Sequence, residues 1–293
     1  MKCGTVAIIG RPSSGKSTMV NTIVEMPVSI TARTPQTTRN AIRGIYTEDR
    51  GQLIFTDTPG YHLNDQSLNL RLQQIAVASL KETDIILYMI DSTRAPGLEE
   101  LAIVEIIKKA HRPVVCALNK CDLARTDKIE EARSFVNEQI PDAVTFETSA
   151  KKDKGIDDLL IKLYELSPEG EMLYPADSYT DQPVEFRISE IIRGNTISLV
   201  SQELPHAIYV EVSDLEHREE ANEIWVRAFI IVERESQKGI IVGKGGANIK
   251  KIRIASFKAI KPIFPGKKLQ LDLRVKAQPK WRHNQIILDK LLN

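Results

Sequence analysis

Short apolar runs alternate with longer segments of helical periodicity through the first half of the chain. The runs predict strands at residues 6–9, 41–46, 53–56, 85–90, 113–118 and 144–146. Segments with apolar residues three or four positions apart predict helices at residues 17–24, 68–80, 98–110, 129–139 and 156–166. Apolar strands that lack alternation and are separated by helices indicate a mainly parallel sheet buried on both faces. Residues 1–168 are therefore expected to form a doubly wound α/β domain.

The pattern then breaks, and a different order of elements follows. Residues 167–183 hold three prolines and one glycine without a sustained period, which predicts a linker over residues 169–183. Beyond it, the pattern predicts a helix at 185–201, strands at 207–212, 224–232 and 269–275, a helix after Gly246 and another at 281–291. Residues 184–293 are therefore expected to form an α+β domain. Gly194 and Asn195 lie within the first of these helices and are expected to kink or end it.

The composition narrows the class of protein. The chain is 42% hydrophobic and 27% charged, which is typical of globular proteins. Its three cysteines form no C-x-x-C pair, so neither a disulfide framework nor a zinc site is expected. The N-terminus lacks the features of a signal peptide, and no apolar run reaches the ~18 residues of a membrane span. These features predict a soluble, cytoplasmic protein.

The charge is divided unevenly along the chain. Residues 226–293 hold 16 Lys or Arg and four Asp or Glu, a net charge of +12, whereas the chain as a whole carries +1. Such a split indicates either a module that binds a polyanion or a solvated lysine-rich surface, and charge alone does not separate these alternatives.

The segment Gly10–Ser17 reads G-x-x-x-x-G-K-S and lies between a predicted strand and a predicted helix. In that context, the backbone N–H groups of the loop and the helix N-terminus form a cradle for phosphates. Lys16 is expected to reach the β- and γ-phosphates, and Ser17 to bind Mg²⁺.

Three further loops follow predicted strands. Asp57-Thr-Pro-Gly60 offers a carboxylate that can hold Mg²⁺ through water and an N–H group that can contact the γ-phosphate. In Asn119-Lys-Cys-Asp122, the carboxylate can accept two hydrogen bonds from guanine, which adenine lacks the donors to supply. In Ser149-Ala-Lys151, the Ala150 N–H would meet guanine O6. All four loops lie at the carboxyl ends of strands, where open α/β sheets bind ligands.

A threonine between the first helix and the second strand is expected to complete the metal site. The segment 34–39 offers Thr37 and Thr38, and we prefer Thr38. The metal ligands are thus Ser17, Thr38 and Asp57, and Lys16, Thr38 and Gly60 are the expected catalytic residues. The residues expected to bind GTP are Gly10, Arg11, Pro12, Ser13, Ser14, Gly15, Lys16, Ser17, Thr18, Asp57, Thr58, Pro59, Gly60, Tyr61, Asn119, Lys120, Cys121, Asp122, Ser149, Ala150 and Lys151.

These motifs make residues 1–170 similar to small GTPases of the translation-factor-related class. Tyr61 stands where Ras-like proteins carry a water-orienting glutamine. This substitution resembles that of the GTPases with a hydrophobic residue at the position; alternatively, Tyr61 is an aromatic residue that packs on the core. The sequence shows no catalytic base and no arginine finger, which predicts slow intrinsic hydrolysis.

A helix-turn-helix closed by G-x-x-G, here Gly243 to Gly246, is the mark of a KH module, which binds single-stranded nucleic acid. The order of elements resembles the type II class of KH domain. The residues expected to bind RNA are Gly243, Lys244, Gly245, Gly246, Lys250, Lys251, Arg253, Lys280, Trp281 and Arg282. Trp281 either stacks on a base or caps the core.

A GTPase joined to a KH domain by a Tyr-Pro-rich linker resembles the Era family over essentially the whole chain. The resemblance implies a Mg²⁺-dependent GTPase that binds the 3′ end of 16S ribosomal RNA, assists assembly and maturation of the small ribosomal subunit and associates loosely with the inner membrane. It further implies a monomer and a coupling to growth or cell-cycle control. Ser13 and Ser14 replace the family's usual Asn and Val, which puts activation by K⁺ in doubt.

An alternative function is an RNA chaperone that binds GTP as a conformational ligand and rarely hydrolyses it. Tyr61 favours this alternative, because it cannot orient a water as glutamine does. Single-turnover hydrolysis with and without ribosomal RNA distinguishes the two functions.

Overall fold

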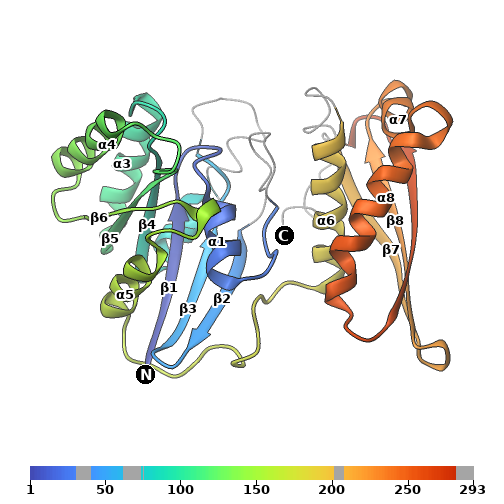
Figure 1. The fold of residues 1–293 in the computed structure, drawn as a ribbon, viewed down its shortest axis with the longest axis horizontal. Helices are drawn as coiled ribbons and strands as arrows, with labels where there is room; N and C mark the ends of the chain where they lie inside the picture. Colours follow the sequence, from blue (N-terminus) through green and yellow to red (C-terminus); the bar gives the residue numbers. More distant parts are fainter. Residues whose placement is uncertain (31–40, 62–73, 75, 201–207, 282–293) are drawn as a thin grey trace. The chain divides into compact units, whose positions relative to one another are not determined.

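The computed structural model describes residues 1–30, 41–61, 74, 76–200 and 208–281. The chain divides into two compact units, with the boundary between Asp181 and Gln182. Each unit contains its own sheet, shown for both in Figure 1. The expected fold class, an α/β domain followed by a KH-type α+β domain, is confirmed.

The first unit is built on a six-stranded sheet with the order β2-β3-β1-β4-β5-β6. All neighbouring pairs are parallel except β2 with β3. Its strands are β1 Lys2–Ile9, β2 Ile42–Glu48, β3 Gly51–Asp57, β4 Ile85–Asp91, β5 Val114–Asn119 and β6 Val144–Glu147. Its helices are α1 Lys16–Val24, α3 Leu98–Ala110, α4 Thr126–Gln139 and α5 Ile156–Leu166.

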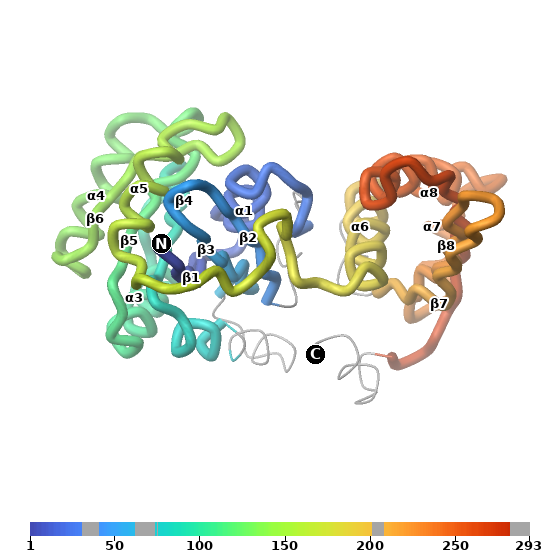
Figure 2. The backbone as a smooth tube through the Cα atoms, turned by 90° about the horizontal axis from the view of Figure 1, so that it is seen from below, coloured from blue at the N-terminus to red at the C-terminus, as the bar shows by residue number. Residues whose placement is uncertain are grey.

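Helices cover both faces of this sheet. One core cluster joins inward residues of β1, β4 and β5 to α3 and α4, and α1 and α5 lie across the other face (Figures 1 and 2). Every residue of β4 is buried, as its continuous apolar sequence predicts for a central parallel strand. The layering places the loops after β1, β3, β5 and β6 at one edge of the sheet, where the expected nucleotide site lies.

The second unit is a three-stranded sheet with helices on one face (Figure 1). β8 lies between β7, to which it is antiparallel, and β9, to which it is parallel. Its core joins the inward side chains of the strands to α6, α7 and α8. The elements are α6 Val184–Leu199, β7 Tyr209–Arg218, β8 Glu223–Val232, α7 Glu235–Val242, α8 Ala247–Ile260 and β9 Lys268–Ala277.

The structure corrects one expected helix break. Helix α6 continues through Gly194 and Asn195 to Leu199. Asn195 and Thr196 donate side-chain hydrogen bonds of 3.0 and 2.7 Å to carbonyls one turn earlier. The helix is stabilised across the glycine by packing, since it has buried residues on both sides of Gly194. β7 also extends to Arg218, six residues beyond the expected strand. Most of the expected helices at 68–80 and 281–291 lies outside the described residues.

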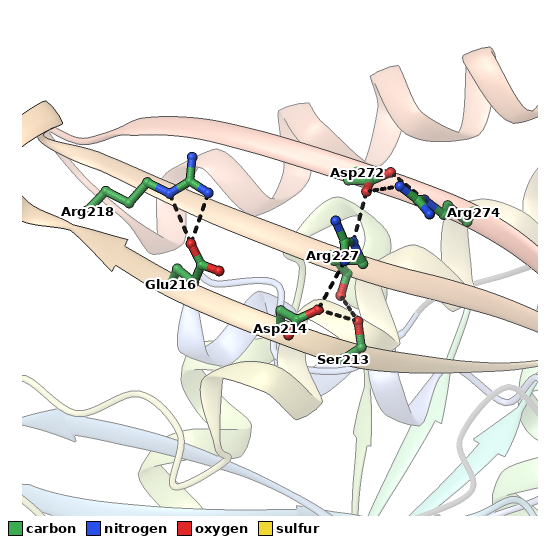
Figure 3. Close-up of polar contacts among 7 residues, drawn as sticks. All are labelled: Ser213, Asp214, Glu216, Arg218, Arg227, Asp272 and Arg274. Carbon is green, nitrogen blue, oxygen red and sulfur yellow. Dashed lines mark hydrogen bonds and ion pairs between the residues drawn. The ribbon is translucent and has the colours of Figure 1, made fainter.

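The outer face of the second sheet carries a network of ion pairs, drawn in Figure 3. Arg227 donates a hydrogen bond of 3.0 Å to Asp272, and Arg218 donates one of 2.9 Å to Glu216. Both guanidinium groups also lie near the ring of Trp225, at 4.6 and 5.1 Å from its centroid. The arginines of this face are therefore already paired with carboxylates and an aromatic ring.

Candidate nucleotide site and RNA-binding surface

The phosphate loop has the backbone that a phosphate cradle requires. Gly15, just before α1, adopts a φ of +102°, a value that L side chains rarely reach. At Gly10, a Cβ atom would lie 2.3 Å from the carbonyl oxygen of Met89, so no side chain fits there. Ser13 also adopts a positive φ, of 64°. Gly15 and Ser13 therefore give the loop the tight turn with positive φ values that a phosphate cradle requires.

Lys16 is buried within this loop. Its Nζ donates hydrogen bonds of 3.1 and 3.0 Å to the carbonyl oxygens of Gly10 and Arg11. Burial lowers the pKa of Lys16 to about 8, although the charges of Asp57 and Glu100 act in the opposite direction. A buried ammonium group is stabilised strongly by an anionic ligand, and a phosphate chain would be such a ligand.

Asp57 lies at the end of β3 and is fully buried. Its Oδ2 accepts a 2.6 Å hydrogen bond from the Ser29 hydroxyl, and the neighbouring Thr58 hydroxyl donates to the carbonyl of Ile8 at 2.6 Å. Ser17 contributes a second oxygen from the first turn of α1. A carboxylate and a hydroxyl are the hard oxygen ligands that suit Mg²⁺. Thr37 and Thr38 lie outside the described residues.

Gly60 and Tyr61 pack against the phosphate loop. A Cβ atom at Gly60 would lie 2.7 Å from the Cα of Pro12, so the close approach of the two loops requires glycine. The Tyr61 N–H donates a 3.2 Å hydrogen bond to the carbonyl of Gly10. The half-buried ring of Tyr61 packs on the core cluster beneath α3 and α4. Of the two roles that the sequence leaves open for Tyr61, this contact is the packing role.

Asn119 joins three of the predicted loops. Its Nδ2 donates a 2.8 Å hydrogen bond to the carbonyl of Ser14 in the phosphate loop. Its Oδ1 accepts hydrogen bonds from the Ala150 N–H at 3.0 Å and from the Thr148 hydroxyl at 3.3 Å. One buried amide thereby fixes the phosphate loop relative to the two loops expected to hold guanine.

The loop that follows Asn119 presents Asp122. Lys120, with a positive φ of 65°, places its Nζ 2.6 Å from Oδ2 of Asp91. Burial would raise the pKa of Asp91, but the Lys120 charge and hydrogen bonds from Lys120 and Thr93 lower it overall. Asp122 accepts a 2.6 Å hydrogen bond from the Ser149 hydroxyl, which orients one carboxylate oxygen.

The turn between α7 and α8 carries the G-x-x-G segment. Gly243, Gly245 and Gly246 all have positive φ values, of 72°, 60° and 77°. At Gly243 a Cβ atom would lie 2.8 Å from Cγ of Asn248, whereas at Gly245 nothing lies within 4 Å. The backbone at Gly245 is therefore open to an approaching ligand.

The turn and the helix α8 that follows it expose a row of basic side chains, here called the basic row. Lys244, Lys250, Lys251 and Arg253 are exposed, and the structure shows no ion pair for them among residues 208–281. This arrangement contrasts with the paired arginines of the outer sheet face. The positive charge of the second unit is therefore available on the side of the G-x-x-G turn.

A groove of about 610 Å³ runs between α8 and the edge of β9. Ile254 and Phe257 supply apolar surface, and Arg253 and Lys258 supply positive charge. Bases stack on such surfaces while lysines and arginines contact phosphates. The remaining lining residues are Trp225, Leu269, Gln270, Leu271 and Asp272.

Trp281 does not face this groove. It is 2% exposed and packs against Tyr209, with ring centroids 4.7 Å apart, and against Ile231. Its role is thus to cap the outer face of the sheet, and its inclusion among the RNA-binding residues is corrected because a buried ring offers no face to a base. Lys280 is exposed, and Arg282 lies outside the described residues.

Comparisons with known proteins cover the whole chain. A family model described as 50S ribosome-binding GTPase matches residues 5–120, and a KH domain model matches residues 203–282. GTPase Era of Treponema denticola is 48% identical over 293 residues, covering 99% of each chain, and that of Borrelia turicatae is 45% identical over 294 residues, covering 100% of each. The chain belongs to the Era family of GTPases.

Solved structures agree with this assignment. A variant of Era from Aquifex aeolicus bound to GDP and AlF4⁻ matches with a TM-score of 0.93 and 32% identity, over 100% of this chain and 99% of that one. A complex of Era with MgGDPNP and nucleotides 1506–1542 of 16S ribosomal RNA gives the same TM-score, identity and coverage. The expectation that the chain is a GTPase is confirmed.

Within this Era-family site, the structure brings together the predicted residues of the phosphate loop, Asp57 to Tyr61, Asn119 to Asp122 and Ser149 to Lys151. Two contributors escaped sequence reasoning: Ser29, which holds Asp57, and Glu100, which pairs with Arg11. Neither belongs to a short motif. The sequence offered one signal: Glu100 falls on the apolar, buried face of its helix, where a carboxylate is unusual.

Proposed function

We propose that this Era-family GTPase is a GTP-driven switch that binds the 3′ end region of 16S ribosomal RNA and assists assembly and maturation of the small ribosomal subunit. The observation that carries the proposal is the exposed basic row beside a partly apolar groove and an open G-x-x-G turn, with no ion pair to that row among residues 208–281. The likeness over the whole chain to an Era bound to that RNA supports the choice of RNA.

On the nucleotide side, each role is assigned to residues whose geometry fits it. Mg²⁺, held by Ser17 and Thr38 directly and by Asp57 through water, would neutralise charge on the phosphates. Lys16 exchanges its carbonyl partners for the β- and γ-phosphates, and the Gly60 N–H faces the γ-phosphate. Asp122 selects guanine. Because no residue of this set is an evident base, intrinsic hydrolysis is slow until a partner orders the site.

On the RNA side, the phosphate backbone passes over Gly245, and bases enter the groove between α8 and β9. The basic row provides the salt-dependent share of affinity, and the apolar surface of Ile254 and Phe257 provides stacking. The arginines of the outer sheet face take no part, because their charges are already neutralised by carboxylates.

A binding titration tests the proposal on the full chain. A labelled oligonucleotide with the 3′ end sequence of 16S ribosomal RNA should bind far more tightly than its scrambled version. Replacing Lys250 and Lys251 by Glu should abolish binding, and replacing both by Gln should lower the salt slope by about 1.4, because each phosphate contact to a single strand contributes about 0.7. The matched control is Lys109→Glu, an exposed charge reversal on α3.

Equal affinity for both oligonucleotides would contradict recognition of the 3′ end. Unchanged affinity in the folded double variant would contradict the α8 surface itself.

Membership of the Era family suggests three further properties, which we include in the proposal. These are a loose association with the inner membrane, a monomeric state, and a coupling of nucleotide state to growth or cell-cycle control. Among the described residues, no helix has the length and apolar character needed to cross a membrane. Flotation of the purified chain with anionic vesicles tests the membrane association.

A further inference from the structure

Arg11 connects the phosphate loop to helix α3. Its side chain turns to the first turn of α3, where Nε lies 2.7 Å from Oε1 of Glu100 and 4.0 Å from Oε2 of Glu99. The side chain of Glu100 is 1% exposed and that of Arg11 is 10% exposed, whereas that of Glu99 is 25% exposed. The pair with Glu100 is therefore shielded from solvent.

The main chain of Arg11 belongs to the cradle itself. Its carbonyl oxygen accepts the 3.0 Å hydrogen bond from Lys16 and a 3.3 Å hydrogen bond from the Ser14 N–H. A shift of Arg11 would thus displace a partner of the lysine that faces the phosphates. The carbonyl of Arg11 thus holds Lys16, and its side chain pairs with Glu100.

A buried carboxylate is unfavourable unless a partner compensates for its lost hydration. Burial raises the pKa of Glu100 to about 7, and the largest opposing effect comes from the charge of Arg11. An apolar residue would fill this position of α3 without that penalty, since the neighbouring side chains Ile103, Val104 and Ile107 belong to the core. Helix packing alone therefore does not account for a glutamate here.

The remaining groups around Glu100 do not replace Arg11. The charges of Glu99 and Asp91 oppose ionisation of Glu100, and Arg94 favours it less than Arg11 does. Tyr88, on β4, has a buried hydroxyl without a hydrogen-bond partner among the described residues, and its pKa is raised by burial and by the Glu100 charge. Lys16 also senses the charge of Glu100.

We propose that Glu100 is a positioning residue for nucleotide binding, which holds the Gly10–Ser13 half of the phosphate loop in place through its buried ion pair with Arg11. The pair restrains the loop when the carboxylate is charged. It weakens as the pH falls through about 7, where Glu100 takes up a proton. Nucleotide affinity that depends on this contact is present above that pH and is lost below it.

The test compares Glu100→Gln with the matched control Glu105→Gln, an exposed glutamate of the same helix, in the full chain. GDP affinity of Glu100→Gln should be about tenfold below wild type at about pH 8 and within about twofold of it at about pH 6. The ratio of wild-type to variant affinity isolates Glu100, because protonation of the nucleotide affects both proteins equally. Glu105→Gln should match wild type at both pH values.

A second pair of variants tests whether Glu100 acts through Arg11. Arg11→Gln alone should lower GDP affinity relative to wild type with the same dependence on pH as Glu100→Gln. Adding Glu100→Gln to Arg11→Gln should cause little further loss of GDP affinity. For Glu100→Gln, the kcat of hydrolysis should stay within about threefold while KM rises at about pH 8, since the pair sets the loop before chemistry. Arg11→Gln also keeps the test valid if Glu100→Gln fails to fold.

Three outcomes would overturn the proposal. A ratio that is the same at both pH values would show that the charge of Glu100 has no role. An affinity of wild type that rises relative to Glu100→Gln at low pH would show that repulsion between Glu100 and the phosphates dominates. Additive losses in the double variant would show that Glu100 does not act through Arg11.

Discussion

Asn119→Ala should destabilise the first unit without affecting the second. The substitution removes the amide that bonds to Ser14, Ala150 and Thr148 at 2.8, 3.0 and 3.3 Å. Because Asn119 is 2% exposed, water does not readily replace these contacts. The carbonyl of Ser14 and the N–H of Ala150 lose a buried partner.

The size of the effect follows from these contacts. Each hydrogen bond contributes about 1 kcal/mol net, so three of them amount to about 3 kcal/mol. For a domain of this size, 1 kcal/mol shifts the unfolding midpoint by about 2–4 °C, so the first unit should unfold about 6–12 °C lower. Saturating GDP should restore part of the loss, because a ligand that binds only the folded state stabilises it.

Two optical signals separate the units. Both tryptophans of the chain, Trp225 and Trp281, belong to the second unit, so fluorescence excited selectively at tryptophan reports on that unit. Far-ultraviolet circular dichroism reports on both. The variant should lower the midpoint of one dichroism transition and leave the fluorescence transition in place.

Asn137→Ala is the matched control, because Asn137 is exposed on α4 and its replacement removes an amide of the same size. It should leave both transitions unchanged within about 2 °C. A loss below about 1 kcal/mol for Asn119→Ala would refute the structural role assigned to its amide. A shift of the fluorescence transition would refute the independence of the two units.

Three further substitutions have expected outcomes. Asp122→Asn should greatly weaken GTP binding and improve binding of xanthosine triphosphate, whose C2 carbonyl suits an amide donor; equal losses for both nucleotides would reject guanine selection by Asp122. Gly245→Asp should abolish RNA binding and leave intrinsic hydrolysis within a few fold. Gly245→Asn, which also tolerates a positive φ but adds no charge, should retain more affinity for RNA. RNA binding by folded Gly245→Asp would exclude the turn at residues 243–246 as an RNA contact. Wild type should hydrolyse GTP at similar rates in matched KCl and NaCl, and Ser13→Asn should create a K⁺-specific increase; a strong K⁺ preference of wild type would show that Ser13 or the backbone already completes a cation site.

The motifs with a fixed spacing could be located from the sequence alone, because their geometry is local. Gly10 to Ser17 and Gly243 to Gly246 are short segments whose backbone shape follows from their glycines. The apolar strands were equally accessible, since a parallel sheet buried on both faces requires continuous apolar runs.

Contacts between distant segments were beyond this reasoning. Ser29 reaches Asp57 across 28 positions, and the pair of Arg11 with Glu100 joins a loop to a helix that begins 87 residues later. Helix α6 was expected to kink or end at Gly194 because glycine has a low helix propensity, but packing of the helix on its sheet outweighs that local effect.

The linker illustrates the same limit in a place that matters for function. Its first thirteen residues, 169–181, pack on the first unit and behave as part of it. Gln52, fully buried on β3, accepts hydrogen bonds of 3.0 Å from the N–H groups of Leu173 and Tyr174 through Oε1. Residues 171–183 form no helix or strand, as their prolines indicate, but composition does not reveal that the chain is anchored on the first unit.

The anchoring extends to the strand that follows residues 31–40. On β2, the Ile45 N–H donates to the carbonyl of Tyr179 at 3.0 Å, and Arg43 pairs with Asp181 at 2.9 Å. Helix α6 begins at Val184, so only residues 182 and 183 separate the last anchored residue from the second unit. The segment expected to hold the metal ligand Thr38 leads directly into β2, and the linker therefore gives the nucleotide site a short covalent route to the RNA-binding unit.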